Sequence, residues 1–183
     1  MDTDYSLRYP IGKLQDQPFT GDEPYSDKIR KAHILDIKFL PSLMEEAVLN
    51  LDAAQLHTLY RPGGWTIHQV VHHVPDSHLN AYIRFKLALT ENNPVIKPYD
   101  EAAWAELSDT RNLPINISLT LLHALHTRWV ELLNNISEED WNKTVFHPEH
   151  KRNISLWNLL ASYAWHGKHH VAHITSLRER MKW

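Results

Sequence analysis

Residues 155–182 read SLWNLLASYAWHGKHHVAHITSLRERMK. The apolar residues of this stretch return every three to four positions, which is the period of an α-helix with one buried face. Ser155 directly precedes the pattern, and serine is a preferred residue at the N-cap of a helix. The stretch therefore predicts one long helix that runs from Ser155 to about Lys182 and is roughly 40 Å long at the standard rise.

Three further segments have the same apolar period, at about residues 26–50, 66–90 and 118–135. The second of them begins with Thr66 and Gln69, a capping-box pair that satisfies backbone groups at a helix N-terminus. The third is separated from the second by a proline-containing crossover. Four long helices with at least one long crossover predict an all-α protein with a four-helix bundle.

The remaining segments are short or irregular. Residues 1–25 are polar and contain several prolines and glycines, so they predict an extended N-terminal arm. Short extra helices are expected near residues 52–56 and 100–107, and residues 143–153 predict an irregular loop or a small hairpin. We expect residues 1–183 to form a single domain, because the length suits one hydrophobic core.

Composition excludes several classes of function. The chain has no cysteine, which rules out disulfides, thiolate metal sites and a cysteine nucleophile, and which fits a cytoplasmic protein. The net charge of −3 gives no basic surface for a nucleic-acid backbone. No apolar run is long enough to cross a bilayer, so no membrane partner is expected.

A histidine cluster in the last predicted helix indicates a metal site. Of the 14 histidines, four lie between His166 and His173. Residues four apart share one face of a helix, so His166 with His170, or His169 with His173, could bind one ion. The apolar stripe includes His170 and borders His166, whereas His173 and especially His169 lie toward solvent. The pattern therefore favours His166 and His170.

A third ligand is expected from the helix at 66–90, which contains His72, His73 and His78. On a helical wheel His78 lies inside the apolar stripe, His73 lies on its polar flank, and His72 points away. The wheel alone slightly prefers His78 and leaves His73 as the alternative. The other histidines of the chain are expected on the surface or in packing roles: His68, His72, His123, His126, His147 and His150.

Two common metal sites are disfavoured by the residues present. The spacing of His166 and His170 is that of a zinc protease helix, but Gly167 stands where the catalytic glutamate would be. The inward Glu-x-x-His pattern of carboxylate-bridged metal pairs is also missing from the long helices. One divalent ion with three nitrogen ligands and open coordination positions is the expected site.

Several stretches of the chain have a familiar pattern, above all the two that lie along the second long helix. They are Trp65–His73, Asp76–Leu87, Tyr9–Gly12, Lys97–Trp104, Leu125–Trp129 and Trp165–Ile174. On these stretches, which together cover most of the chain, the sequence resembles the YfiT-type proteins of the DinB superfamily. Lys168, where relatives often have histidine, and Pro75 are departures that remove no ligand.

The resemblance implies a four-helix bundle that holds a zinc or nickel ion and forms a homodimer. It assigns the second histidine of the His-His pair, His73, as the ligand on the second helix, and it assigns His166 and His170 on the fourth. The resemblance therefore selects His73 as the third ligand, in place of His78, which the helical wheel slightly preferred. The implied activity is that of a metal-dependent hydrolase, which acts on a small-molecule substrate.

Two alternatives to the hydrolase stay open. Relatives in the superfamily include thiol S-transferases, which join a low-molecular-weight thiol to electrophiles, and a bound ion can activate water or a thiol. A non-catalytic metal-binding or ligand-binding bundle also fits, because the sequence identifies no general base. Asn80 and Arg84 could orient an anionic substrate. Candidates for a proton carrier or a partner of the ligands are Asp76, His169 and His173.

Overall fold

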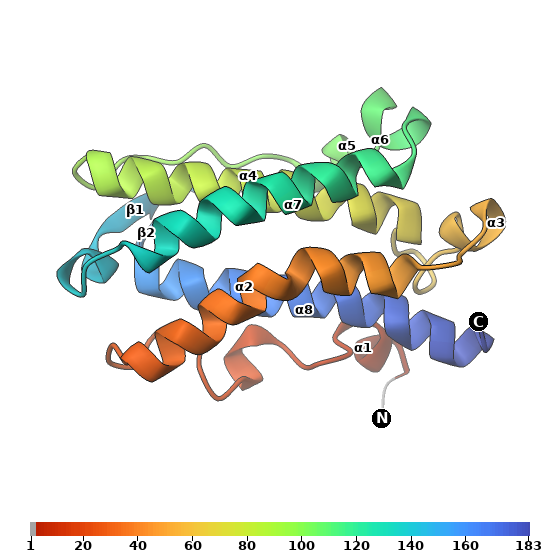
Figure 1. The fold of residues 1–183 in the computed structure, drawn as a ribbon, viewed down its shortest axis with the longest axis horizontal. Helices are drawn as coiled ribbons and strands as arrows, with labels where there is room; N and C mark the ends of the chain where they lie inside the picture. Colours follow the sequence, from red (N-terminus) through yellow and green to blue (C-terminus); the bar gives the residue numbers. More distant parts are fainter. Residues whose placement is uncertain (1–2) are drawn as a thin grey trace.

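The computed structural model describes residues 3–183, and four long helices run along its longest axis (Figure 1). They are α2 (Asp27–Val48), α4 (Ile67–Thr90), α7 (Ile115–Asn134) and α8 (Leu156–Met181). Each packs against two of the others, in the ring order α2, α7, α4, α8. The predicted all-α four-helix bundle is confirmed.

The order of the helices in the ring differs from their order along the chain. The long helices α2 and α4 follow one another in sequence but lie across the bundle from each other, and so do α7 and α8. Their connections pass over opposite ends of the molecule (Figure 1). As a result α4 and α8, the two helices with the histidine clusters, are direct neighbours.

Side-chain caps explain where these helices begin. The Thr66 hydroxyl accepts from the backbone N–H of Gln69, whose side chain in turn caps the backbone of Thr66, as predicted. Ser155 and Asn158 form the same arrangement at the start of α8. The third long helix starts at Ile115, three residues before the expected position, and Pro114 is its N-cap residue. Proline is tolerated at a helix start, because the backbone N–H that it lacks would have no partner within the helix there.

Short elements fill the connections. Residues 144–155 form the small hairpin that the sequence left as one of two options, with Val145 opposite Ile154 in an antiparallel pair. The segment expected to be one short helix near residues 100–107 contains one helix and leads into a second. The elements are α3 (Ala53–Leu56), α5 (Glu101–Trp104), α6 (Ser108–Asn112), the 3-10 helix η2 (Glu139–Asn142), β1 (Thr144–His147) and β2 (Arg152–Ser155).

The N-terminal arm is less extended than predicted. It contains the short helix α1 (Thr3–Arg8) and the 3-10 helix η1 (Leu14–Asp16), and it lies along α8 (Figure 1). Two tryptophan side chains of α8 hold it there. The indole N–H of Trp165 donates to the carbonyl of Gly12 at 3.2 Å, and that of Trp157 donates to the carbonyl of Glu23 at 2.9 Å.

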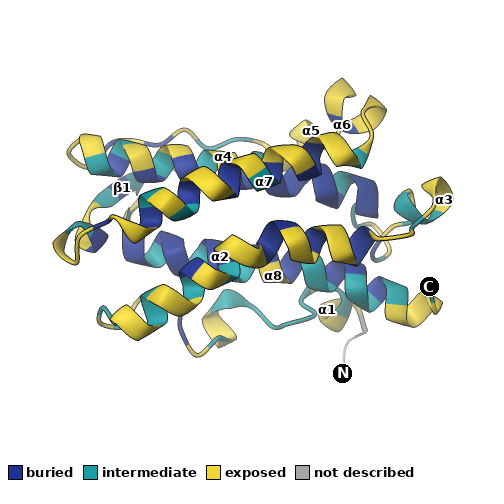
Figure 2. Ribbon diagram, viewed as in Figure 1, coloured by how far each residue is buried: buried dark blue, intermediate teal, exposed yellow. Residues whose placement is uncertain are grey.

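The long helices carry buried residues on the faces that they turn toward one another (Figure 2). These residues form two apolar clusters. One surrounds Trp129 and extends to Tyr163 on α8, and the other surrounds Met44 and includes Ile174 on α8. His166 and His170 lie between the two clusters along that helix. Within residues 3–183, no helix is long and apolar enough to cross a membrane.

Candidate metal centre

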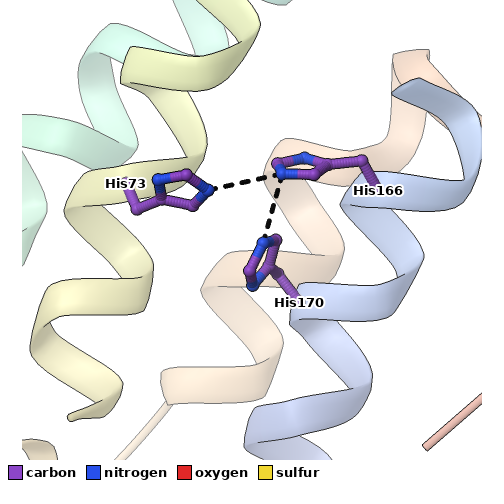
Figure 3. A group of neighbouring side chains, drawn as sticks. All are labelled: His73, His166 and His170. Atoms are coloured by element: carbon purple, nitrogen blue, oxygen red, sulfur yellow. Dashed lines mark hydrogen bonds between the residues drawn. The ribbon is translucent and has the colours of Figure 1, made fainter. Parts of the chain in front are cut away.

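Three histidine side chains from two helices converge between α4 and α8 (Figure 3). The Nε2 atom of His166 lies 3.3 Å from Nε2 of His73 and 3.2 Å from Nε2 of His170. One nitrogen from each ring lies within 4.8 Å of the other two, which is the geometry of a group that could hold a metal ion. Among the described residues, these three histidines alone form a group of three or more metal-ligating side chains within that distance of one another.

Burial keeps these imidazoles neutral, as metal ligands must be. It lowers the pKa of His73 to about 4. For His166 and His170 burial again comes first, with the neighbouring imidazoles adding to it, and both pKa values fall well below the ordinary range. Neutral imidazole nitrogens are preferred donors for zinc, nickel and copper ions. The donor set therefore fits the kind of ion expected from the sequence.

His78, which the helical wheel preferred, contacts the other ring nitrogen of His166. Its Nε2 atom lies 3.1 Å from Nδ1 of His166, and so away from the point where the three Nε2 atoms meet. His78 follows His73 by five residues on α4, which is more than one turn, so it lies further along the bundle. The register between α4 and α8 therefore brings His73 to the cluster and His78 behind it.

The prediction that His169 and His173 lie toward solvent was wrong. Both are buried, because the N-terminal arm and the segment before α4 contact that side of α8. The ring of His173 stacks on Tyr60 at 4.0 Å, and its Nε2–H donates to the carbonyl of Arg8 at 3.0 Å. The ring of His169 stacks on Trp165 at 4.4 Å.

Most of the histidines expected in packing or surface roles pack inside the fold. His68 and His72 both donate from Nε2 to the carbonyl of Leu113 at 3.1 Å, and His72 also accepts from the hydroxyl of Ser118. These bonds tie α4 to the start of α7. His126 and His147 are buried as well, whereas His150 is exposed.

The three converging histidines lie at a cleft of about 320 Å³, which is within the range of small-molecule sites. The residues that line it include two arginines, four aromatic side chains and one carboxylate: Arg8, Tyr9, Tyr60, Arg61, Gly63, Gly64, Trp65, His73, Glu101, Trp165, His166, His169, His170 and His173. Trp65 forms part of the wall, with its ring 4.6 Å from that of His73. The cleft thus combines cationic, aromatic and imidazole groups.

Sequence reasoning singled out none of the three charged cleft residues, Arg8, Arg61 and Glu101. Glu101 lies in the first turn of α5, and partial desolvation, followed by the nearby carboxylate of Asp100, raises its pKa. The stretch Lys97–Trp104 carried part of the family resemblance, which was the available signal. Nothing in the local sequence indicates that α5 lines a cleft whose other residues come from the N-terminal arm, the segment before α4, α4 and α8.

The other polar candidates of α4 do not line this cleft. The guanidinium of Arg84 donates to the hydroxyl of Tyr163 at 3.1 Å and borders a separate cavity, which also contains His147. The amide of Asn80 donates to the backbone carbonyl of Asp76 at 2.9 Å. Burial, followed by the charge of Asp109, raises the pKa of Asp76 to about 6. Of the proposed proton carriers, only His169 and His173 border the cleft.

Comparison with known proteins gives relatives along almost the whole chain. A protein of Bacillus cereus (strain 03BB102) named "Putative metal-dependent hydrolase" is 52% identical over 177 residues, which are 97% of this chain and 98% of that protein. Proteins of Bacillus thuringiensis subsp. konkukian and Bacillus anthracis are equally similar and have names of the same kind.

A solved structure shares the fold. It is YfiT from Bacillus subtilis, described as a probable metal-dependent hydrolase with an unusual four-helix bundle topology. The two chains superpose with a TM-score of 0.91 at 45% identity, covering 97% of this chain and 99% of YfiT. The family model of the DinB superfamily matches residues 37–174, a span that contains all three converging histidines. By helix order, sequence and family model together, the chain belongs to the DinB superfamily.

Proposed function

We propose that the protein is a metal-dependent hydrolase that binds one divalent ion, zinc or nickel, through His73, His166 and His170. The observation that carries this proposal is the convergence of the Nε2 atoms of these three histidines at a cleft. Neutral nitrogen ligands would leave the ion its full charge, and three of them would leave coordination positions open. A divalent ion in such a site supplies Lewis acidity, which acidifies a water or polarises a carbonyl of the substrate.

The residues of the cleft indicate what kind of substrate it accepts. Arg8 and Arg61 bring two permanent positive charges to the lining, which contains one carboxylate, that of Glu101. The carboxylate of Asp4 lies 3.8 Å from the guanidinium of Arg61 and offsets part of its charge. Arg61 is held in place, because its Nε donates to the hydroxyl of Tyr60 at 3.2 Å. We therefore propose a small anionic substrate whose apolar part packs against the rings of Trp65 and Trp165.

Glu101 is the candidate proton carrier. A carboxylate with a raised pKa holds or releases a proton nearer neutral pH than an ordinary glutamate, which suits general acid or base catalysis. In this role Glu101→Gln would reduce the rate by about 100-fold or more while leaving the metal content unchanged. An unchanged rate would remove Glu101 from the mechanism.

Metal analysis of purified variants tests the ligand set. The wild-type protein should contain one ion per chain, and alanine at His73, His166 or His170 should each abolish most of the occupancy. His72→Ala is the matched control, because His72 is the buried neighbour of His73 and its bonds go to Ser118 and Leu113. Full occupancy in His166→Ala or His170→Ala would contradict the assignment.

Activity screening tests the reaction. We expect the metal-loaded protein to hydrolyse anionic esters or amides, and we expect the chelated protein to be inactive. A parallel screen offers electrophiles together with low-molecular-weight thiols. Turnover in that screen alone would identify a thiol S-transferase, and no turnover in either would favour a metal-binding or ligand-binding protein.

A further inference from the structure

A chain of buried histidines leads from the candidate metal centre to the opposite side of the bundle. The Nδ1 atom of His166 lies 3.1 Å from Nε2 of His78, and Nδ1 of His78 lies 3.0 Å from Nε2 of His126. The Nδ1 atom of His126 lies 2.5 Å from the backbone carbonyl oxygen of Ile37. The chain thus connects α8, α4, α7 and α2 in turn, and its two inner members, His78 and His126, are almost inaccessible to solvent.

A proline explains why this carbonyl is free to accept. Within an α-helix the carbonyl of residue 37 would accept from the N–H of residue 41, but residue 41 is Pro41, which has no N–H. A buried carbonyl without a donor is costly. His126 on α7 supplies the missing donor, so that the proline in α2 and the histidine in α7 form one arrangement.

The carbonyl sets the direction of every bond in the chain, because a carbonyl oxygen only accepts. Nδ1 of His126 must therefore carry the proton, which leaves Nε2 of a neutral ring as an acceptor. Nδ1 of His78 must then donate to it, and Nε2 of His78 becomes an acceptor for Nδ1–H of His166. Burial supports neutral rings, since it lowers the pKa of His126 to about 4 and that of His78 well below its ordinary range.

We propose that His78 and His126 are positioning residues that fix His166 in the tautomer with a bare Nε2, the form that can bind a metal ion. The proposal rests on the proposed function for the identity of the ligand. In the reverse order, His166 would place an N–H where the Nε2 atoms of His73 and His170 converge, and no ion could bind that nitrogen. In that order Nδ1 of His126 would carry no proton, so its lone pair would face a lone pair of the Ile37 carbonyl oxygen and the two would repel each other.

Aromatic neighbours hold the central ring of the chain in one orientation. His78 meets Trp129 and Tyr163 edge to face, with ring centroids 5.6 and 5.3 Å away. Neither contact supplies the in-plane bonds that select a tautomer. The tautomer of His78 is therefore determined by its two histidine partners.

Imidazole ¹⁵N NMR of the metal-free wild-type protein gives the first test. We expect His126, His78 and His166 all to carry the proton on Nδ1. A proton on Nε2 of His78 would overturn the proposal. This measurement does not depend on whether the protein binds metal or catalyses hydrolysis, so failure of the proposed function and failure of the histidine chain are distinguishable.

Zinc titration of two variants at one position gives the second test. His78→Leu removes the acceptor for His166 and should raise the Kd by about 10- to 100-fold, the usual effect of losing a partner of a metal ligand. His78→Gln keeps an acceptor oxygen near the place of Nε2 and should bind zinc nearly as tightly as the wild type. His68→Leu is the matched control, since His68 is buried on the same helix and bonds only to a backbone carbonyl.

Other results of the titration would contradict the role of the chain. If both His78 variants bound zinc like the wild type, the chain would have no influence on the ligand. If both lost affinity equally while His68→Leu did not, His78 would act by filling space rather than by accepting a hydrogen bond.

Discussion

Gly167→Ala tests the packing of α8 against α2 next to the candidate metal centre. A Cβ atom at this position would lie 2.9 Å from Cδ1 and 3.2 Å from Cγ of Leu40, and closer still to Cδ2. Leu40 is only 2% exposed, so its side chain has little free space into which it can move. Alanine would therefore force either a strained rotamer of Leu40 or a small separation of the two helices.

Two opposing terms decide the result. Alanine is favoured over glycine inside a helix by about 1 kcal/mol. Overpacking a dense core costs about 1–3 kcal/mol. We expect the overpacking to prevail, with a net loss of about 1 kcal/mol and a Tm lower by roughly 2–4 °C for a chain of this size.

A double-mutant cycle in urea, followed by circular dichroism, separates the two terms. Chelator is present throughout, because a bound ion would stabilise the folded state. Leu40→Ala alone should cost about 2–5 kcal/mol through the cavity it leaves. Adding Gly167→Ala to that variant should then stabilise it by about 1 kcal/mol. If Gly167→Ala raised the stability of the wild type, or had the same effect in both backgrounds, close packing would not be the reason for glycine.

Three further predictions concern acid stability, Asp76 and assembly. The buried histidines have pKa values below the unfolded value of about 6.5, so in acid the unfolded chain binds protons that the folded chain does not. The urea midpoint of the metal-free protein should therefore fall as the pH drops from 6.5 toward 4. A constant midpoint over this range would contradict the prediction. Burial raises the pKa of Asp76 to about 6, so its charge opposes folding above that pH. Asp76→Asn should therefore stabilise the fold by about 1–2 kcal/mol at pH 7.5, and this gain should disappear near pH 4. No gain at pH 7.5 would refute the reasoning. The homodimer remains a prediction, and an exposed apolar stripe on α2 could form its interface: Leu35, Phe39 and Leu43. Sedimentation should give a dimer that Phe39→Arg dissociates, and a wild-type monomer at tens of micromolar, roughly where weak pairs assemble, would argue against it.

The sequence by itself determined the helices and one pair of the candidate ligands. Caps and apolar period are local properties, so they located α4 and α8 to within a few residues. His166 and His170 share a face because they are four residues apart on one helix, whatever lies opposite. The family resemblance added His73, which neither composition nor period could select over His78.

Only the tertiary structure decided which histidines meet at the candidate metal centre and which contact a member of it from another side. The register between α4 and α8 places His73 at Nε2 of His166 and His78 at Nδ1, and a helical wheel contains no information on that register. The arm buries His169 through contacts more than 150 residues distant in sequence, such as that of Trp165 with Gly12. Glu101 reaches the cleft for the same reason: long-range packing sets which side chains meet, whereas local sequence sets only the element that carries each of them.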